Sequence, residues 1–387
     1  MTEVLVLSQT DKQQAPVLSE QTPTVTAEVI AEQVKNAYEQ QSPLKIIGCG
    51  SKAFYGRSIS GVELTVSGYS GIINYEPSEL VITARTGTPL REIEQLLAEH
   101  GQMLGFEPPE FSDNATLGGT IACGISGPRR PYTGAVRDFV LGATIINGKG
   151  EILKFGGQVM KNVAGYDVSR LMTGALGTLG VLLEISLKVI PKPAFEETRI
   201  LPYNHQQMCT LLSTLGRQPI PISATYLHNN LLYVRFSGAK AGVVSAAENI
   251  GGDVLRQAEL FWHQLKEQRL PYFNQDRTLW RVSLPPSAPC IPDLLVDTES
   301  ITEWGGAQRW VYPKDTDALQ QWASDNGGHA SGFRNRCGAS NSKANSSDAN
   351  GSTFSPLSPA LLTLSKRIKN SFDPHNILNP GRLYKDL

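Results

Sequence analysis

The sequence of this 387-residue chain has few cysteines, and no two of them are spaced as metal or redox ligands. The five cysteines are odd in number and widely separated, at Cys49, Cys123, Cys209, Cys290 and Cys337. A disulfide framework needs paired cysteines, and an iron–sulfur centre needs four at short spacings. We therefore expect free thiols that pack as small apolar side chains, and no metal site.

Long apolar runs and an excess of positive charge are also absent. No apolar segment reaches the ~20 residues that a membrane-spanning helix needs. The net charge of −1 gives no reason to expect nucleic acid as a partner. The first residues, MTEVLVLSQTDKQQ, lack the basic and apolar regions of a secretion signal. We therefore expect a cytoplasmic protein.

Two common nucleotide-binding motifs are missing, but glycine clusters take their place. The segment Gly48-Cys49-Gly50-Ser51-Lys52 follows an apolar run, yet it lacks the third glycine of G-x-G-x-x-G and the G-K-[ST] ending of a phosphate loop. Two further clusters lie within residues 113–193: Gly118, Gly119, Gly124 and Gly127, then Gly174, Gly177 and Gly180. Glycine permits positive φ and close approach of the backbone to an anion. Each cluster alone also fits a structural turn, so their order carries the prediction of a phosphate-bearing ligand.

Periodicity predicts two domains of mixed helix and strand. In the first part we expect a helix over 26–40, a helix capped by Thr88 with Pro89 at its first position, and a hairpin turning at Asn147-Gly148. A half-buried strand is expected over 181–189. From about Phe195, strands such as LLYVRFSG, LWRVSL and QRWVYP alternate with helices over 239–250, 258–268 and 315–326. Residues 335–355 are rich in Asn, Ser and Gly, which predicts a mobile loop.

Four strings together resemble a known flavoprotein family. They are GCGSKAFYG, PPEFSDNATLGGTIACGISGPRRPYTGAVRDFVLG, FGGQVMKNVAGYDVSRLMTGALGTLGVLLEISLKVIPKP and FDPHNILNPGRLY. They are similar to the vanillyl-alcohol-oxidase type, whose FAD-binding domain is called PCMH-type, and within it to the FAD-binding subunits of bacterial glycolate oxidases. The resemblance runs from about Pro43 to Tyr384 and is weakest over 193–310 and 334–355.

The resemblance implies an α+β fold. A PCMH-type FAD-binding domain of two α+β subdomains would occupy residues 23–193, and an α+β cap domain would occupy 194–334. A C-terminal segment, 356–387, would return to the FAD domain. Residues 1–22 would be a flexible extension and 335–355 a disordered loop.

The resemblance also implies where FAD would bind. Backbone N–H groups would hold the pyrophosphate, Gly180 and Val181 would lie along the adenine side, and Asn379 would return to the flavin ring. The implied pyrophosphate residues are Gly48, Cys49, Gly50, Ser51, Lys52, Asn114, Ala115, Thr116, Leu117, Gly118 and Gly119. Asn379 also fits a plain turn before Pro380.

Other features near the implied site leave alternatives open. The string KNVAGYD, 161–167, fits either contact with FAD or a turn that opens a short helix. Arg129 and Arg130 fit either a phosphate or partner contact or a solvated pair. Residues 48–57 contain no histidine, and neither Cys49 nor Cys123 matches a linking position of the family. We therefore expect noncovalent FAD.

The substrate site is marked by one residue. Oxidation of a 2-hydroxy acid requires a base for the hydroxyl proton, cations for the carboxylate and a hydride acceptor. Catalytic relatives carry H-x-G-D-G-N-x-H, whereas this chain reads Gly328-His329-Ala330-Ser331-Gly332-Phe333. His329 is thus the candidate catalytic residue, with a surface position before a loop as the alternative.

The implied function is oxidation of glycolate to glyoxylate by an FAD-dependent subunit of a complex. The implied partners are a second FAD-containing catalytic subunit and an iron–sulfur subunit that receives the electrons. Membrane contact would be only indirect, at the inner face of the plasma membrane through the complex. Two alternatives remain: an electron-relay or structural flavin subunit, and, more distantly, a stand-alone FAD-dependent oxidase of alcohols or sugar lactones.

Overall fold

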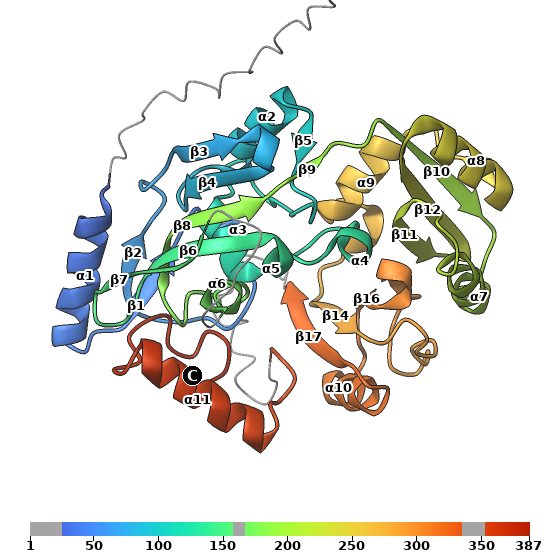
Figure 1. Ribbon diagram of the computed structural model, residues 1–387. Coiled ribbons are helices and arrows are strands. Elements are labelled where there is room, and N and C mark those ends of the chain that lie inside the picture. Colours follow the sequence, from blue (N-terminus) through green and yellow to red (C-terminus); the bar gives the residue numbers. More distant parts are fainter. Residues whose placement is uncertain (1–24, 158–166, 335–352) are drawn as a thin grey trace, which may run out of the picture.

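The computed structural model describes residues 25–157, 167–334 and 353–387 (Figure 1). Three predictions therefore lie wholly or mostly outside the described residues: the N-terminal extension over 1–22, most of the KNVAGYD string, and most of the loop over 335–355. The described part has the expected α+β content, arranged around two large sheets.

The first large sheet has five strands in the order β3-β4-β8-β6-β7, and every neighbouring pair is antiparallel. Its strands are β3 (Ile72–Glu76), β4 (Val81–Arg85), β6 (Val140–Ile146), β7 (Ile152–Gly156) and β8 (Val181–Lys188). The helices of this region are α2 (Leu90–Glu99), α3 (Leu117–Cys123), α4 (Arg130–Thr133), α5 (Val136–Phe139) and α6 (Val168–Leu171). Two short strands, β5 (Gln102–Met103) and β9 (Ile190–Pro191), pair at its side, and a 3-10 turn, η1 (Pro77–Glu79), precedes β4.

The central strand β8 is more deeply buried than its alternating sequence predicts. Leu182 packs in the core formed with α2 and α3, whereas Val181 packs in a second core with α1 (Ala27–Glu39). Ser186 is buried as well, because its hydroxyl pairs with that of Thr83 at 2.9 Å. The prediction of a half-buried strand was therefore wrong, since both faces of the strand are covered.

A smaller unit packs beside this sheet and receives the C-terminus. Strands β1 (Leu44–Ile47) and β2 (Val62–Thr65) are parallel and share an apolar core with α1. The backbone N–H of Leu44 donates to Ile377 O at 2.7 Å, and that of Asn379 donates to Leu44 O at 3.1 Å. The segment after α11 (Pro359–Phe372) thus lies alongside β1, as predicted, with α11 below the sheet in Figure 1.

Two local predictions were wrong in detail. Helix α2 begins after Pro89, and the Thr88 hydroxyl accepts from Gly71 N instead of capping the helix. The hairpin of β6 and β7 is present, but its loop spans residues 147–151, and Gly150 rather than Gly148 has positive φ. The Asn147 side chain closes this loop by accepting from the N–H groups of Lys149 and Glu151.

The second large sheet has eight strands and stands to the right of the first in Figure 1. Its order is β13-β10-β12-β11-β15-β16-β14-β17. The strands are β10 (Phe195–Leu201), β11 (Ile222–His228), β12 (Leu231–Gly238), β13 (Asp253–Val254), β14 (Leu279–Ser283), β15 (Ile301–Glu303), β16 (Gln308–Val311) and β17 (His329–Arg334). The helices of this region are α7 (His205–Leu215), α8 (Lys240–Ile250), α9 (Ala258–Lys266) and α10 (Thr316–Asp325), with 3-10 turns η2 (Pro271–Phe273) and η3 (Trp304–Gly306).

A buried ion network joins the two sheet regions. Arg235 on β12 and Arg129 before α4 both contact the Glu107 carboxylate, at 2.9 and 3.1 Å. Arg129 also pairs with Glu196 on β10 at 2.5 Å. The two guanidinium groups lower the pKa of the Glu107 carboxyl against the opposing effect of its burial. Because a buried carboxylate is stable only when it is paired, this network fixes one sheet region relative to the other.

Candidate functional site

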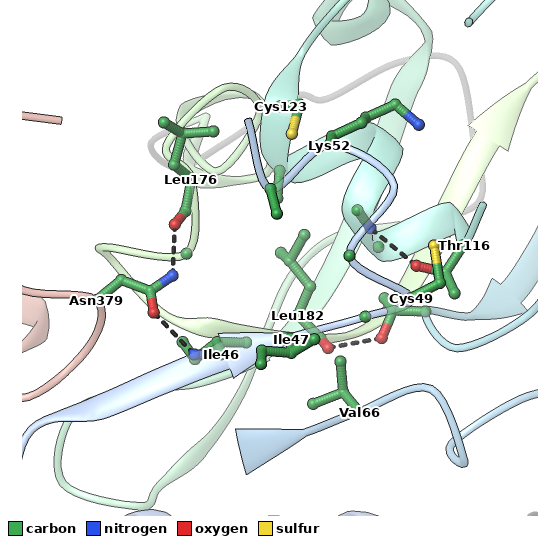
Figure 2. A pocket seen from close by; sticks show the side chains of 18 of the residues that line it. Ile46, Ile47, Cys49, Lys52, Val66, Thr116, Cys123, Leu176, Leu182 and Asn379 are labelled. Carbon is green, nitrogen blue, oxygen red and sulfur yellow. Dashed lines mark hydrogen bonds between the residues drawn. The ribbon is translucent and has the colours of Figure 1, made fainter. Parts of the chain in front are cut away.

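The largest set of predicted site residues surrounds one cavity at the junction of β1, α3, β8 and the C-terminal segment (Figure 2). Its enclosed volume is about 210 Å³, and it opens to solvent. The lining is mostly apolar or glycine, and its other members are Lys45, Cys49, Ser51, Lys52, Thr86, Thr116, Cys123, Asn379 and Arg382.

The loop after β1 supplies free backbone donors. An added Cβ at Gly48 would lie 2.6 Å from Thr116 Oγ1, so only glycine lets this loop approach α3. Gly50 has φ of +78° and nothing within 4 Å of an added Cβ. Within the described residues, the N–H groups of Gly48, Cys49, Gly50 and Lys52 make no hydrogen bond to protein. Free N–H groups around a positive-φ turn form an anion-binding concavity.

The second predicted loop presents glycine surface rather than free amides. Thr116 caps α3, with its Oγ1 accepting from Gly119 N at 3.2 Å, while Leu117 N and Gly118 N donate to Thr88 O and Thr86 O. The N–H groups of Asn114 and Ala115 are likewise bonded to Ser112. Gly118 and Gly119 are helical, and of the four glycines in this cluster only Gly124 has positive φ. These amides already donate to protein acceptors, which does not favour their donating to a pyrophosphate. Their contact with the pyrophosphate stays a prediction.

Asn379 joins two walls of the cavity, as Figure 2 shows. Its Oδ1 accepts from Ile46 N at 2.8 Å, and its Nδ2 donates to Leu176 O at 2.7 Å. An added Cβ at Gly177 would lie 2.8 Å from that Nδ2, which explains a glycine there. Asn379 thus lines the cavity and also has positive φ before Pro380, so both interpretations of this residue describe part of its role.

Buried charges hold the same C-terminal segment. Lys369 Nζ donates to Asp373 Oδ2 and Thr178 O at 2.7 Å and to Leu378 O at 2.9 Å. The Asp373 carboxylate accepts in turn from the N–H groups of Ile377 and Leu378. This pair therefore sets the position of Asn379 relative to the loop at Thr178.

Arg382 is a lining residue that the sequence analysis missed. Its guanidinium donates to the backbone carbonyls of Ala53, Tyr55 and Arg57 at 2.6–2.9 Å, behind the loop that carries the free amides. Burial lowers the pKa of this guanidinium, but not enough to discharge it. The string NPGR contains this arginine, but only its asparagine was expected to reach the flavin.

Lys52 brings a second positive charge to one end of the cavity. Its side chain is buried and makes no ion pair among the described residues, and its Nζ donates to Glu110 O at 3.3 Å. Burial lowers the pKa of Lys52, and it raises the pKa of the neighbouring Cys123 thiol to about 11. A protonated thiol is a poor nucleophile, so Cys123 is not suited to form a covalent bond to a ligand.

The structure brings most of the predicted cofactor residues together, but not all. Ten line the cavity: Gly48, Cys49, Gly50, Ser51, Lys52, Thr116, Gly118, Gly119, Gly180 and Asn379. Asn114 is exposed outside it, Ala115 and Leu117 are buried in the protein, and Val181 points into the α1 core. Leu182 takes the place expected of Val181, because successive side chains of a strand face opposite sides.

His329, the candidate catalytic residue, lines a second cavity. This cavity lies between α4, α5, β14 and β17, and Arg130, Arg137 and Arg281 line it with His329. Neighbouring residues line the two cavities: Cys123 and Leu176 line the first, and Gly124 and Gly174 line the second. Burial and the nearby Arg281 charge lower the pKa of His329, so its imidazole is neutral near pH 7.

The residues around the first cavity fit FAD. Gly119 places no Cβ between α3 and the cavity, the loop amides suit a pyrophosphate, and Lys52 and Arg382 supply positive charge for it. The apolar walls from Ile46, Ile47, Val66, Leu176 and Leu182 suit a flat aromatic system. No cluster of three metal-ligating side chains occurs in the described ranges.

Comparison with protein families agrees with this fit. Residues 22–156 match the family described as FAD binding domain, and residues 355–383 match the one described as FAD linked oxidases, C-terminal domain. The two matched segments meet in the structure where the C-terminal segment lies along β1.

Individual relatives and a solved structure extend the comparison. The chain is 44% identical over 362 residues to glycolate oxidase subunit GlcE of Escherichia coli (strain K12), covering 93% of this chain and 98% of that protein. It is 32% identical over 201 residues to a D-lactate dehydrogenase of Anaerostipes hadrus, covering 51% and 41%, and 28% identical over 218 residues to glycolate oxidase subunit GlcD of Bacillus subtilis (strain 168), covering 55% and 46%. An alkyldihydroxyacetonephosphate synthase shares the fold at TM-score 0.60 and 16% identity, over 91% of this chain and 74% of that one.

Proposed function

The chain belongs to the family of glycolate oxidase subunit GlcE, within the FAD-linked oxidases, and from this premise we propose that it is an FAD-dependent subunit of a glycolate-oxidising complex. The observation that carries the proposal is the glycine-walled cavity with free amides, Lys52 and Arg382. We assign FAD binding to residues 23–193 together with 356–387, and the cap to 194–334. The cofactor is held noncovalently.

The cavity residues divide the work of holding FAD. The loop 48–52 contacts the pyrophosphate through its free N–H groups, and Lys52 and Arg382 offset its charge. Asn379 hydrogen-bonds to both β1 and the loop at Leu176 and so fixes the distance between these two sides of the cavity. When bound, FAD supplies a two-electron acceptor for the oxidation.

The second cavity supplies the groups that the substrate needs. His329 is a neutral imidazole and is able to accept the hydroxyl proton of a 2-hydroxy acid. The arginines around it supply the positive charge that a carboxylate requires. We therefore assign His329 as the general base of the reaction.

The complex is inferred from relatives whose names include the word subunit. We propose as partners a second FAD-containing catalytic subunit and an iron–sulfur subunit that accepts the electrons. No helix in the described part of the chain has the length and apolarity to cross a membrane. We place the protein in the cytoplasm, reaching the inner face of the plasma membrane only through its partners.

The second candidate function is an electron-relay subunit. One observation favours it: His329 lines a different cavity from the predicted cofactor residues, and the two cavities share no lining residue. In a relay subunit the substrate would react on a partner's flavin, and His329 would have no chemical role.

Replacement of His329 by glutamine separates the two functions. A general base contributes roughly 10²- to 10⁴-fold, so the rate at which glycolate reduces the bound flavin should fall by that amount while FAD content stays unchanged. The matched control is His263→Gln, because His263 is exposed on α9 and lines neither cavity. An unchanged rate in His329→Gln would favour the relay function.

A further inference from the structure

Three arginines from separate elements converge on the second cavity, here called the arginine pocket. Arg130 comes from α4, Arg137 from α5 and Arg281 from β14, and His329 lies beside them at the start of β17. Arg130 and Arg137 belong to the FAD-binding region, and Arg281 and His329 belong to the cap. The pocket is therefore formed only where the two sheet regions meet.

Among the described residues, no carboxylate pairs with the positive charges of the arginine pocket. No aspartate or glutamate lines it, and none of its three arginines forms an ion pair among the described residues. Burial and the charges of Arg281 and Arg137 lower the pKa of Arg130, against a smaller opposing effect from Asp138. The Asp138 carboxylate itself accepts from Ala135 N. Like charges that share a partly buried cavity repel one another, so an anion bound there would be stabilised.

The neighbouring Arg129 provides an internal comparison. It directly precedes Arg130 in the chain and is buried, and the carboxylates of Glu107 and Glu196 pair with it. Arg129 therefore has a structural role, whereas Arg130, one residue later, has no carboxylate partner in the part of the chain that the structure describes. The pair that the sequence left open thus divides into one structural arginine and one that faces a cavity.

The side chains of the arginine pocket are held in place before any ligand arrives. The Arg130 guanidinium stacks on the Trp304 ring, 4.4 Å from its centroid, and Arg281 Nη2 donates to the Tyr55 hydroxyl at 2.9 Å. Thr173, which also lines the pocket, has a hydroxyl without a partner among the described residues. Planar guanidinium groups in fixed positions suit the two oxygens of a carboxylate.

The arginine pocket and the FAD cavity are lined by neighbouring residues of the same two segments. Gly174 N donates to Ile121 O at 3.0 Å, and Leu176 N donates to Ala122 O at 2.9 Å, so these two segments are tied together. Ala122 and Leu176 line the FAD cavity, and Gly174 lines the arginine pocket. Gly174 has φ of +81°, and no atom of the described residues lies within 4 Å of a Cβ added there.

We propose that Arg130, Arg137 and Arg281 form a binding site for the carboxylate of a small organic acid, next to the cavity assigned to FAD. This inference rests on the proposed function in naming the acid as the reaction's substrate or product. It adds the residues that recognise the carboxylate and excludes neutral diols as ligands. An acidic side chain of a partner subunit is the competing occupant.

Binding of inert probes tests the site on the purified, FAD-loaded chain. Oxalate and acetate carry the carboxylate but cannot be oxidised as 2-hydroxy acids, and ethylene glycol carries hydroxyls without charge. Calorimetric titration in low-salt buffer without phosphate should show binding of oxalate and acetate, weaker at higher salt, and none of ethylene glycol. Arg137→Gln and Arg281→Gln should each weaken oxalate binding roughly 10- to 100-fold, since a charged hydrogen bond is lost.

Controls keep the result independent of folding and of the proposed function. Arg137 is exposed, so its variant should fold even if Arg281→Gln, which loses the Tyr55 contact, does not. Arg217→Gln, an exposed cap arginine outside the pocket, should bind oxalate as the wild type does. FAD content is read separately by absorbance, so a loss of flavin would count against the proposed function and not against this site.

Two outcomes would overturn the proposal. One is that folded protein binds no oxalate at concentrations up to about 10 mM, because a specific site should have a dissociation constant of about 1 mM or lower. The other is equal binding by the wild type and the Arg137 and Arg281 variants. Loss of oxalate binding when partner subunits assemble, with glycolate turnover retained, would instead assign the pocket to an acidic side chain of a partner.

Discussion

Gly118 and Gly119 are neighbours in α3, but alanine should act differently at each. At Gly118 an added Cβ would lie 2.7 Å from Thr86 Cβ and 3.0 Å from Thr86 O, closer than real contacts allow. At Gly119 the nearest atom would be Thr116 Oγ1 at 3.3 Å, and the rest of the space is the cavity. The first glycine is therefore required by packing and the second by the ligand.

The structure gives a magnitude for each change. Gly118→Ala should cost about 1–3 kcal/mol of overpacking, of which better helix propensity recovers about 0.5–1 kcal/mol. Gly119→Ala should gain the same helix propensity and meet only Thr116 Oγ1, at 3.3 Å, so the stability of the flavin-free protein should stay close to that of the wild type. With FAD bound, its methyl group occupies ligand space, and a cost of about 1–3 kcal/mol corresponds to roughly 5- to 150-fold weaker binding.

Two assays separate the effects. Urea unfolding of the flavin-free proteins reports stability, and titration of FAD with quenching of its fluorescence reports affinity. We expect Gly118→Ala to lower the unfolding midpoint and Gly119→Ala to lower only the affinity. Wild-type affinity in a fully folded Gly119→Ala protein would refute the assignment of α3 to the cofactor cavity.

Two further predictions concern buried charges. Burial raises the pKa of the Glu303 carboxyl from 4.5 to about 7, so the folded state holds a proton that the unfolded chain releases, and stability should fall as pH rises from about 4.5 to about 7. Glu303→Gln should abolish that fall, since the glutamine carbonyl can still accept from Trp310 and Gln308. In urea unfolding, the variant should be more stable than the wild type by roughly 3 kcal/mol at pH 8 and equally stable at pH 4. Lys369→Met should leave the Asp373 carboxylate buried without its partner, lowering stability by about 3–5 kcal/mol and reducing FAD occupancy through the displaced Asn379. An unchanged unfolding midpoint would contradict this role for Lys369.

The sequence predicted elements with strong periodicity well. The helix expected over 26–40 is α1, and the string LLYVRFSG is strand β12 over the same residues. Strand β3 was missed because five residues between Gly71 and Pro77 carry too weak an alternation to stand out. Burial was misjudged in β8, since the alternation of Glu184, Ser186 and Lys188 does not reveal that both faces of the sheet are covered.

For the site, the sequence predicted loops better than individual side chains. The glycine strings located the cavity, but Val181 and Leu182 could not be distinguished, because a one-residue change of register exchanges the faces of a strand. Asn114, Ala115 and Leu117 were included through the family string although none faces the cavity. The arginine pocket was out of reach, because Arg130, Arg137 and Arg281 converge only through the packing of two sheets that lie far apart in the sequence.

The flavin held by this chain should react with a 2-hydroxy acid directly. The test is to mix the purified FAD-loaded chain, without partners, with glycolate under anaerobic conditions and to follow the flavin absorbance at about 450 nm. We expect the absorbance to bleach, because the FAD cavity, His329 and the arginine pocket all belong to this chain. A flavin that stays oxidised at saturating glycolate, and is reduced only after the partner subunits are added, would contradict it.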